Sequence, residues 1–383
     1  PADDIDALLD FVRSKGIDLT VVGPEAPLVN GIVDRFEENG FAVAGPSQAA
    51  AILEGSKAFA KDFMKRHSIP TAAYQTFDQM DQAGEALENN QFQFPVVLKA
   101  DGLAAGKGVF VCANLEESQE ALDAIMGERR FGASGDHLVI EEFLEGEEAS
   151  FMVFSDGINI LPMVPSQDHK AIYEGDRGPN TGGMGAYSID SILSDELRQQ
   201  ILDEVIHPTI RGMSQEGRLY RGILYAGLMI TGDGPKVLEF NVRLGDPETQ
   251  VVLPRLKSDL LTVLNQMAQG NLKDVNLEWS AEAAVCVVIA AGGYPGSYEK
   301  GKEISGLEMA GEEKNTITFH AGTALKEEKV VTSGGRVLGV TSLAPTLRAA
   351  IIKAYEGVNK THFDGMYCRR DIASKGIDRL ERN

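Results

Sequence analysis

The sequence predicts a multi-domain α/β protein, and three observations support this fold class. Helix-like and strand-like segments alternate from the start of the chain. A glycine-rich segment, residues 101–108, lies between two apolar, β-branched runs, as in a hairpin. With 383 residues and 43% hydrophobic content, the chain can form several cores, and its length suggests roughly two to four domains.

The first part of the chain predicts an αβαβ arrangement. Residues 3–14 and 28–39 have helical spacing of apolar residues, whereas 17–22 and 41–44 are strand-like. A parallel sheet of this kind normally begins with a strand and its turn, and Pro1 is not an initiator methionine. We therefore expect that the chain lacks its natural N-terminus.

Glu25 follows the first predicted strand, at the sheet edge where ligands of open α/β sheets bind. It is a candidate for binding a substrate hydroxyl or amine. A carboxylate at the start of a helix is an equally good interpretation.

The next segment predicts a helix over residues 49–67, with Lys57 near its start, and then a glycine-rich hairpin. The loop does not match a P-loop, because its spacing differs and glycine follows the second lysine. Glycines let backbone N–H groups approach phosphate oxygens, and the lysines supply positive charge. An ordinary tight hairpin with solvated lysines is the alternative. The candidate phosphate-binding residues are Lys99, Gly102, Gly106, Lys107 and Gly108.

A helix near residues 115–125 precedes a strand at 137–142, which runs into a hinge-like segment at 143–148. Backbone groups here can hydrogen-bond an adenine edge, and Glu148 can bind ribose hydroxyls. An acidic surface turn is the alternative. The candidate nucleotide-binding residues are Glu141, Glu142, Phe143, Leu144 and Glu148.

Residues 166–170 and 178–185 are rich in polar residues and glycine, which indicates ordered loops with close backbone approach. His169 has no second histidine at metal-ligand spacing. A structural role for it is common, and among functional roles we favour binding over proton transfer.

A later strand predicts a metal site. Polar and apolar residues alternate there, so that Val237, Glu239, Asn241 and Arg243 share one face and Leu238, Phe240 and Val242 the other. Oxygen atoms of Glu239 and Asn241 suit magnesium that is otherwise held by substrate phosphates. A half-exposed strand with solvated side chains is the alternative.

The rest of the chain predicts a helix at 259–269, strands at 283–291 and 336–341, and a helix near 346–359. Arg336 can meet a phosphate, although an exposed arginine in a hairpin turn is the stronger interpretation. The predicted domains are residues 1–72, 73–140, 141–278 and 279–383.

Composition excludes several classes of partner. The net charge of −21 opposes binding to nucleic acid or an anionic membrane. The three cysteines are scattered without a C-x-x-C pair, as expected for reduced thiols in a cytoplasmic protein. We expect small-molecule partners, and a monomer is compatible with this composition.

Several segments resemble the phosphoribosylamine–glycine ligase family, the glycinamide ribonucleotide synthetases of the ATP-grasp superfamily. The segments are residues 22–28, 53–57, 99–109, 166–170, 178–187 and 239–250. The resemblance implies an ATP-grasp fold with a partial, Rossmann-like first domain and a C-terminal α/β cap domain. It implies that ATP phosphorylates glycine and that the amine of 5-phosphoribosylamine then displaces phosphate, with Mg²⁺ or Mn²⁺ as the metal.

The same resemblance implies roles for individual residues. Glu239 and Asn241 would hold the metal, Lys57, Lys99 and Lys107 would assist at the phosphates, and Arg243 would grip the glycine carboxylate and then the acyl phosphate. The remaining implied substrate-binding residues are Glu25, Asp168, His169, Lys170, Asn180, Thr181, Gly182, Gly183, Met184, Asp246 and Glu248.

Two departures leave alternatives open. Residues 225–230 contain no acidic metal ligand, which many ATP-grasp enzymes place on this strand, and the opening strand and turn are not present. Another ATP-grasp carboxylate–amine ligase or carboxylase, or an inactive truncated ATP-binding module, would share many of these features.

Overall fold

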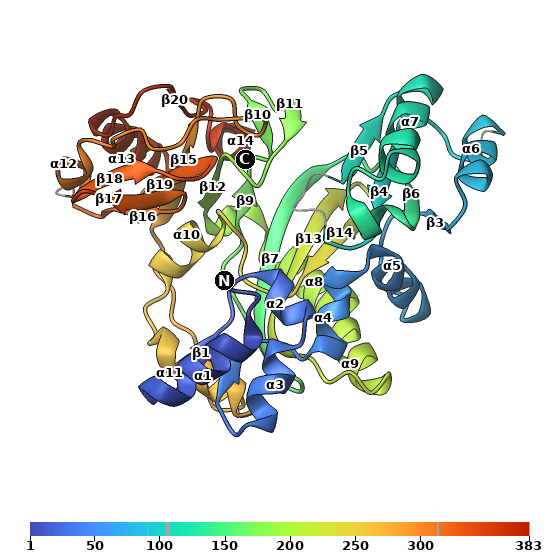
Figure 1. Cartoon of the computed structure of the whole chain (residues 1–383), viewed down its shortest axis with the longest axis horizontal. Helices are drawn as coiled ribbons and strands as arrows, with labels where there is room; N and C mark the ends of the chain where they lie inside the picture. The colour runs from blue at the N-terminus through green and yellow to red at the C-terminus, as the bar shows by residue number, and fades with distance from the viewer. Residues whose placement is uncertain (90, 104–107, 312–313, 383) are drawn as a thin grey trace. The chain divides into compact units, whose positions relative to one another are not determined.

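The computed structural model describes residues 1–89, 91–103, 108–311 and 314–382. The chain forms two compact units, each assembled from three segments (Figure 1). Unit 1 contains residues 1–163, 195–244 and 259–276, and unit 2 contains residues 164–194, 245–258 and 277–383. Helices and sheets both contribute to each unit, so the predicted α/β class is confirmed. Within the described residues, no helix is long and apolar enough to cross a membrane.

Unit 1 begins with the predicted alternation of helices and strands. Its elements are α1 (Ile5–Lys15), β1 (Thr20–Val21), α2 (Glu25–Val29), α3 (Ile32–Glu38) and β2 (Val43–Ala44). The two strands pair in parallel, with Thr20 opposite Val43. The single helix expected over 28–39 is wrong, because Gly31 adopts φ +86° and separates α2 from α3.

The helix expected over 49–67 is also divided. It forms α4 (Gln48–Gly55) and α5 (Lys57–Arg66). Ser56 lies between them in an extended conformation, and its hydroxyl accepts a hydrogen bond from the Phe59 N–H at 3.0 Å. Ser56 therefore caps α5, which makes Lys57 the first residue of that helix.

The glycine-rich hairpin is confirmed as part of an antiparallel sheet. The sheet contains β3 (Tyr74–Phe77), β6 (Leu138–Glu142), β4 (Val96–Ala100) and β5 (Val109–Cys112), in this spatial order. Lys99 and Val109 face each other across the hairpin. The helices α6 (Met80–Glu88) and α7 (Leu115–Leu122) contribute Leu87 and Leu122 to a core shared with Leu98 and Ile140.

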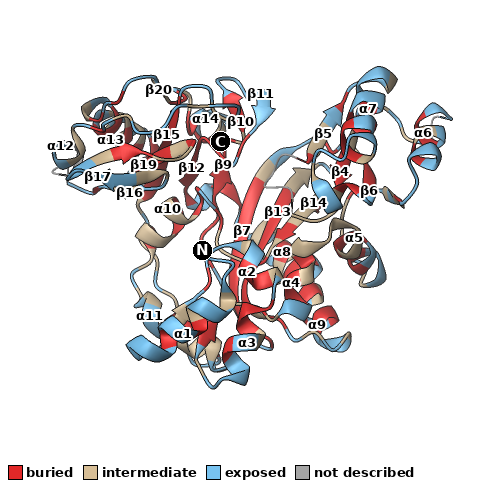
Figure 2. Ribbon diagram, in the orientation of Figure 1, coloured by how far each residue is buried: buried red, intermediate tan, exposed pale blue. Residues whose placement is uncertain are grey.

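A second antiparallel sheet forms the centre of unit 1. Its strands are β14 (Gly234–Asn241), β13 (Arg221–Thr231), β7 (Glu147–Asp156) and β8 (Ile160–Pro162), again in spatial order. Most residues of β7 and β13 are buried (Figure 2). The helices α8 (Asp195–Ile201), α9 (His207–Gln215) and α11 (Leu260–Ala268) complete this region, with α8 against β14 and α11 against β7 and β13.

Strand β14 carries a bulge that the sequence pattern did not indicate. Gly227 pairs with Glu239, whereas the next residue, Leu228, pairs with Val237, so Leu238 is the extra residue. The strict alternation expected along this strand is therefore wrong before Glu239. Val237 is fully buried and does not belong to the polar face.

Unit 2 contains a six-stranded sheet whose strands come from separate segments of the chain. Its main path runs through β16 (Thr316–His320), β19 (Arg336–Ala344), β15 (Ala283–Ala291), β12 (Gly185–Ser188) and β9 (Gln167–Asp168), and β20 (Met366–Tyr367) also pairs with β15. The helix α13 (Leu347–Lys360) packs against β15 and β19. Parts of both segments expected to be loops, 166–170 and 178–185, are thus strands: residues 167–168 and 185 belong to this sheet, and residues 178–180 belong to a separate two-stranded hairpin.

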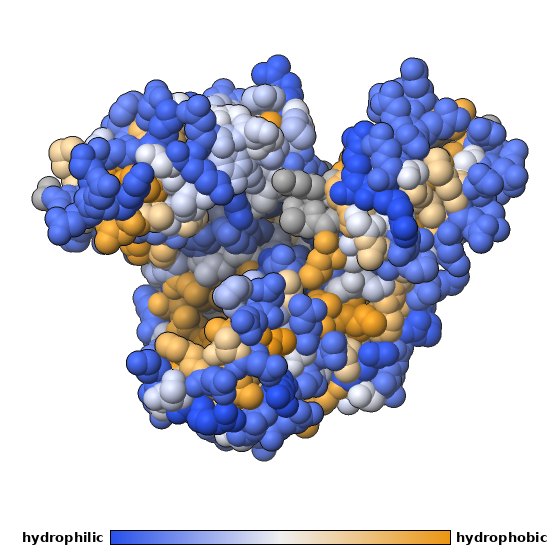
Figure 3. Space-filling model, viewed as in Figure 1, coloured by the Kyte–Doolittle hydropathy of each residue, from blue (hydrophilic) through white to orange (hydrophobic). Residues whose placement is uncertain are grey.

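Shorter elements complete unit 2. They are the hairpins β10 (Ala171–Tyr173) with β11 (Arg177–Asn180) and β17 (Thr323–Lys326) with β18 (Lys329–Thr332), and the helices α10 (Thr249–Val252), α12 (Leu307–Gly311) and α14 (Ser374–Arg382). Hydrophilic residues cover much of the visible surface (Figure 3), in line with a charged fraction of 24%.

Arg255 ties three parts of unit 2 together from a buried position. Its side chain is 1% exposed and donates hydrogen bonds to Ser188 Oγ at 2.8 Å, Asp190 Oδ1 at 2.9 Å and the Ser280 carbonyl at 3.0 Å. Removal of such a donor lowers the free energy of unfolding, because a buried acceptor is left without a hydrogen bond.

We predict that Arg255→Met lowers the free energy of unfolding by about 3 kcal/mol, because the buried Ser188 hydroxyl and the part-buried Ser280 carbonyl lose their donor. Urea unfolding followed by circular dichroism measures this change. Arg211→Met, an exposed change on α9, is the control and is expected to shift stability by less than about 0.5 kcal/mol. Equal, small effects of both changes would contradict the anchoring role.

Candidate active site

A buried carboxylate between two lysines lies where α5, β4 and β6 meet in unit 1. Glu141 is 2.8 Å from Lys61 Nζ and 2.9 Å from Lys99 Nζ, and all three side chains are less than 10% exposed. Burial lowers the pKa of Lys61 to about 8, and the nearby Glu141 opposes this shift. A carboxylate buried this deeply requires such partners.

The same two lysines are connected to β14, the strand that carries the predicted metal site, Lys99 directly and Lys61 through Thr71. Lys99 Nζ donates to the Leu238 carbonyl at 3.1 Å, which belongs to the bulged residue of β14. Lys61 Nζ donates to Thr71 Oγ1 at 2.7 Å, and this hydroxyl donates to the Val237 carbonyl at 2.6 Å. The bulge therefore places two consecutive carbonyl groups at the lysine cluster.

The beginning of the glycine-rich loop is anchored to α5. Lys57 Nζ donates to the Gly102 carbonyl at 2.9 Å, and Asp101 accepts from the Ala58 N–H at 3.1 Å. Gly102 has φ +92°, and a Cβ atom there would lie 2.9 Å from Ser134 Oγ, so a larger residue is disfavoured. At the other end, the Gly108 carbonyl accepts from the Ala100 N–H at 2.8 Å. Gly106 and Lys107 lie outside the described residues.

The charge of Lys57, at the base of the glycine-rich loop, interacts with Glu239 of the predicted metal site. Burial lowers the pKa of Lys57, Glu239 opposes this shift, and Lys99 adds to it. Because these electrostatic effects require proximity, Lys57, Lys99 and Glu239 share one region of unit 1.

The predicted hinge joins β6 to β7 through irregular backbone. Glu142 accepts from the Ala73 N–H at 3.0 Å, which fixes the end of β6. Phe143 is 39% exposed, Leu144 is buried, and Glu148 lies opposite Met229 near the start of β7.

Glu239 and Asn241 lie near the end of β14, opposite Gly227 and Tyr225 of β13. One carboxylate and one amide oxygen on alternate residues fit Mg²⁺, which needs few protein ligands when phosphates complete its coordination. In the described part of the chain, no group of three or more His, Cys, Asp or Glu side chains is arranged to hold a metal ion. The residues therefore fit a metal that depends on a bound phosphate.

Arg243 was expected on the face of this strand, but β14 ends at Asn241. The guanidinium nevertheless donates to Asn241 Oδ1 at 3.2 Å, and it pairs with Glu25 at 3.3 Å and Glu54 at 2.9 Å. Glu54 also accepts from the Val242 N–H at 2.7 Å. Burial raises the pKa of Glu54 to about 7, and Arg243 opposes this shift.

In unit 2, Arg336 connects two of the predicted substrate-binding segments. It pairs with Asp246 Oδ2 at 2.8 Å and donates to the Asp246 carbonyl at 2.9 Å and the Gly182 carbonyl at 2.6 Å. The side chain is 20% exposed. The expectation of an exposed arginine in a turn is therefore wrong, because distant partners hold it.

Backbone contacts order the segment that includes Gly183. Thr181 donates through N–H and Oγ1 to the Lys170 carbonyl, both at 2.8 Å, and its Oγ1 accepts from the Gly183 N–H at 3.0 Å. Gly183 has φ +108°, and a Cβ atom there would lie 2.4 Å from Pro247. Asn180 is exposed at the end of β11, whereas Met184, Asp168 and Glu248 are buried.

His169 is 1% exposed in unit 2. Its Nε2 atom accepts from the Ala373 N–H at 3.3 Å, and no described atom is a hydrogen-bond partner of its Nδ1 atom. Burial lowers the pKa of His169 to about 4, and Arg369 and Lys375 add to this shift. A buried donor without an acceptor typically costs about 1–3 kcal/mol.

Sequence reasoning missed several residues of these clusters. Lys61 could have been identified from the sequence, because it lies four residues after Lys57 and therefore on the same side of α5. Glu54 belongs to a segment that carries the family resemblance, and Arg336 was considered only as a possible phosphate contact. Their partners Arg243 and Asp246 were not predicted, because they are far away in the sequence. Arg369 gave no signal.

Comparison with known proteins adds a family-level result. Models of phosphoribosylglycinamide synthetase match the chain in order, with the N domain at residues 1–54, the ATP-grasp (A) domain at 55–249 and the C domain at 284–375.

Named relatives agree with this match. Phosphoribosylamine–glycine ligase of Halalkalibacterium halodurans is 53% identical over 374 residues, which cover 98% of this chain and 86% of that protein. The ligase of Vibrio cholerae is 50% identical, with 98% and 87% covered.

Solved structures support the fold. Phosphoribosylamine–glycine ligase of Thermotoga maritima has a TM-score of 0.78 and 40% identity, with 86% of this chain and 81% of that chain covered. The biotin carboxylase domain of Hydrogenobacter thermophilus 2-oxoglutarate carboxylase, solved with MgADP, has a TM-score of 0.74 at 17% identity, with 95% and 78% covered, and this shows the fold alone.

We predict that His169 makes stability fall at acidic pH. Its folded pKa of about 4 lies below the ordinary value of 6.5, so the unfolded chain binds more protons between these values and stability rises with pH there. Between pH 7 and pH 5, this histidine should contribute a loss of about 2 kcal/mol in unfolding free energy.

The measurement compares urea unfolding of the wild type and His169→Gln at both pH values, with the exposed His207→Gln as control. The acid-induced loss should be smaller in His169→Gln than in the other two proteins. An unchanged loss would contradict the assigned environment.

Proposed function

Because the chain belongs to the phosphoribosylglycinamide synthetase family, we propose that it is an ADP-forming carbon–nitrogen ligase that joins glycine to 5-phosphoribosylamine. The products are glycinamide ribonucleotide, ADP and phosphate, in purine biosynthesis. The observation that carries the proposal is the contact of Lys99 Nζ with the Leu238 carbonyl at 3.1 Å, next to Glu239, beside the contact of Lys57 Nζ with the Gly102 carbonyl at 2.9 Å. These contacts bring phosphate-binding and metal-binding residues into one region.

Two steps account for the reaction. A carboxylate oxygen of glycine attacks the γ-phosphorus of ATP, and the bond to the β,γ-bridging oxygen breaks to release ADP. The amine nitrogen of phosphoribosylamine then attacks the acyl carbon of glycyl phosphate and loses a proton, and the carbon–oxygen bond to phosphate breaks. Positioning the reactants supplies much of the rate, on the order of 7–11 kcal/mol in favourable cases.

The nucleotide would bind within unit 1. Lys99 and Lys57 would contact its phosphates, with the backbone of Gly102 and Gly108 and the loop between them, which includes Gly106 and Lys107. The hinge at 141–144 would meet the adenine edge, and Glu148 the ribose. The buried pair of Lys61 and Glu141 supports this assignment, because it fixes the position from which Lys99 reaches a ligand.

Glu239 and Asn241 would hold Mg²⁺, and Mn²⁺ is an alternative with similar oxygen ligands. These two residues would hold the metal where its positive charge can neutralise the charge that develops on the phosphates. Arg243 already contacts Asn241, so it is suited to grip the glycine carboxylate and then the acyl phosphate. Glu25 and Glu54 would orient its guanidinium.

The unit 2 residues around 168–170, 180–184 and 246–248 would bind the substrates. Arg336 supports this role because it couples Gly182 to Asp246 and so orders both segments. We propose no partner beyond these small molecules, and a cytoplasmic location agrees with the expected chemistry.

The direct test is substrate-dependent ADP release. We expect ADP release with MgATP, glycine and phosphoribosylamine together, and formation of glycinamide ribonucleotide in equal amount. Replacement of glycine by bicarbonate should give no stimulation. Release with bicarbonate but not glycine would instead indicate a carboxylase, and no release in any arm would indicate an inactive ATP-binding protein.

We predict that Glu239→Gln reduces turnover at least about 100-fold, because metal-assisted charge stabilisation is lost. Its unfolding midpoint should change little. Asp233→Asn, in the exposed turn of the same hairpin, is the matched control and should retain wild-type turnover. Near-normal activity of Glu239→Gln at limiting magnesium would refute the metal assignment.

A further inference from the structure

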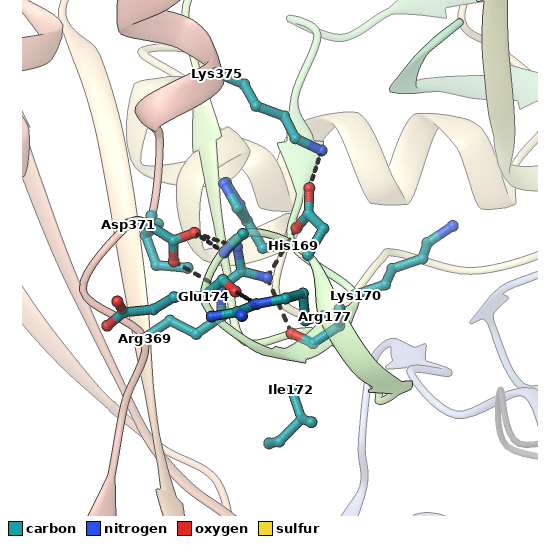
Figure 4. Close-up of polar contacts among 12 residues, drawn as sticks. His169, Lys170, Ile172, Glu174, Arg177, Arg369, Asp371 and Lys375 are labelled. Carbon is teal, nitrogen blue, oxygen red and sulfur yellow. Dashed lines mark hydrogen bonds and ion pairs between the residues drawn. The ribbon is translucent and has the colours of Figure 1, made fainter. Parts of the chain in front are cut away.

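Arg369 holds the β10–β11 hairpin to the C-terminal part of unit 2. The guanidinium is buried and donates to the Ala171 carbonyl at 3.0 Å and Asp176 Oδ1 at 2.9 Å. It also forms a bidentate pair with Asp371, at 2.8 Å and 2.7 Å (Figure 4). One side chain thus joins the start of β10 and the turn of the hairpin to the segment 369–373.

Neighbouring contacts strengthen this attachment. Asp371 Oδ2 accepts from the Gly175 N–H at 2.8 Å, and Glu174 accepts from the Arg370 N–H at 3.1 Å. Lys375, at the start of α14, pairs with Asp176. The hairpin that directly follows His169 therefore has a fixed position on this segment.

The same segment fixes the protonation pattern of His169. Nε2 accepts from the Ala373 N–H, so the ring proton of the neutral histidine is on Nδ1. The charged groups around the ring are Arg369, Lys375, Asp176 and Asp371, and the ring of Tyr187 lies 6.1 Å away. Nδ1 is buried without a described acceptor.

We propose that His169 donates its Nδ1–H to an oxygen atom of a bound substrate, and that Arg369 is the positioning residue that holds His169 for this contact. The proposal rests on the function proposed above. The acceptor is an oxygen atom of a substrate: a carboxylate oxygen of glycine, or a phosphate or hydroxyl oxygen of phosphoribosylamine. Each of these oxygen atoms can accept a hydrogen bond. A base role is disfavoured, because the Nε2 lone pair is already used by Ala373.

The charge balance around the ring agrees with a neutral donor. Burial is the main cause that lowers the pKa of His169, and Arg369 is the next. A protonated ring would lose the bond from Ala373, because Nε2 would itself carry a proton. Arg369 therefore favours the form of His169 that both accepts from Ala373 and donates through Nδ1.

Two substitutions separate the two ring nitrogens. In His169→Gln, the side-chain carbonyl can accept from Ala373, but no donor remains near the Nδ1 position. In His169→Asn, the amide nitrogen lies near the Nδ1 position and keeps a donor. We expect His169→Gln to raise the KM of one substrate about tenfold and His169→Asn to raise it less, with the KM of ATP unchanged in both.

Separate titrations of glycine and phosphoribosylamine identify which substrate supplies the oxygen. A selective rise for glycine assigns the carboxylate, and one for phosphoribosylamine assigns the phosphoribosyl group. Unchanged KM values for both substrates in His169→Gln would overturn the proposal, as would a greater defect in His169→Asn.

The role of Arg369 is tested by pH. In Arg369→Met, loss of the cation beside two carboxylates should raise the pKa of His169, so kcat/KM should fall below about pH 6 more steeply than in the wild type. Arg370→Lys, at the exposed neighbour, is the control. If Arg369→Met does not fold, Arg369→Lys should raise the KM of the same substrate as His169→Gln. An unchanged profile, or an unchanged KM in Arg369→Lys, would overturn the positioning role.

A binding measurement tests the His169 hydrogen bond separately from the proposed ligase reaction. Thermal shifts of the wild type and His169→Gln are compared with glycine and with ribose 5-phosphate as a stable probe. A smaller shift in His169→Gln supports the donor even if no glycinamide ribonucleotide forms, which would refute only the proposed reaction. Equal shifts with both probes would overturn the donor itself.

Discussion

The buried carboxylate of Glu141 imposes the central constraint on unit 1. It requires both Lys61 and Lys99 as partners, because either lysine alone would leave a less compensated charge in the interior. These contacts join α5, β4 and β6, and hydrogen bonds to the Leu238 and Val237 carbonyls extend the connection to β14. The direction of Lys99 and the position of Glu239 are therefore consequences of one buried interaction.

Other carboxylates of this acidic chain fix the orientation of arginine side chains in a similar way. Arg243 contacts Glu25 and Glu54, and Arg336 contacts Asp246, so the guanidinium groups are held in defined orientations before an anionic ligand arrives. Preorganised charges need little rearrangement when charge develops during a reaction. The net charge of −21 is thus compatible with anionic substrates, because binding depends on these local arrangements.

The sequence predicted features that depend on nearby residues. The β-branched runs around the glycine-rich loop indicated the β4–β5 hairpin, and the spacing of Glu239 and Asn241 indicated a polar strand face. The break at Ser56 and the bulge at Leu238 were missed, since tertiary contacts decide between such local alternatives. Arg369 was not identifiable, because its partners Ala171 and Asp176 are nearly two hundred positions away.

The three-segment construction of unit 2 also constrains the order in which the chain can fold. Residues 164–194 emerge from the ribosome long before residues 369–373, which supply Arg369 and the Ala373 N–H. The β10–β11 hairpin and His169 must remain without these contacts while the intervening chain is made. Closing such a long loop is slow relative to local pairing. During synthesis, the Arg369 and His169 contacts should therefore be among the last in unit 2 to form.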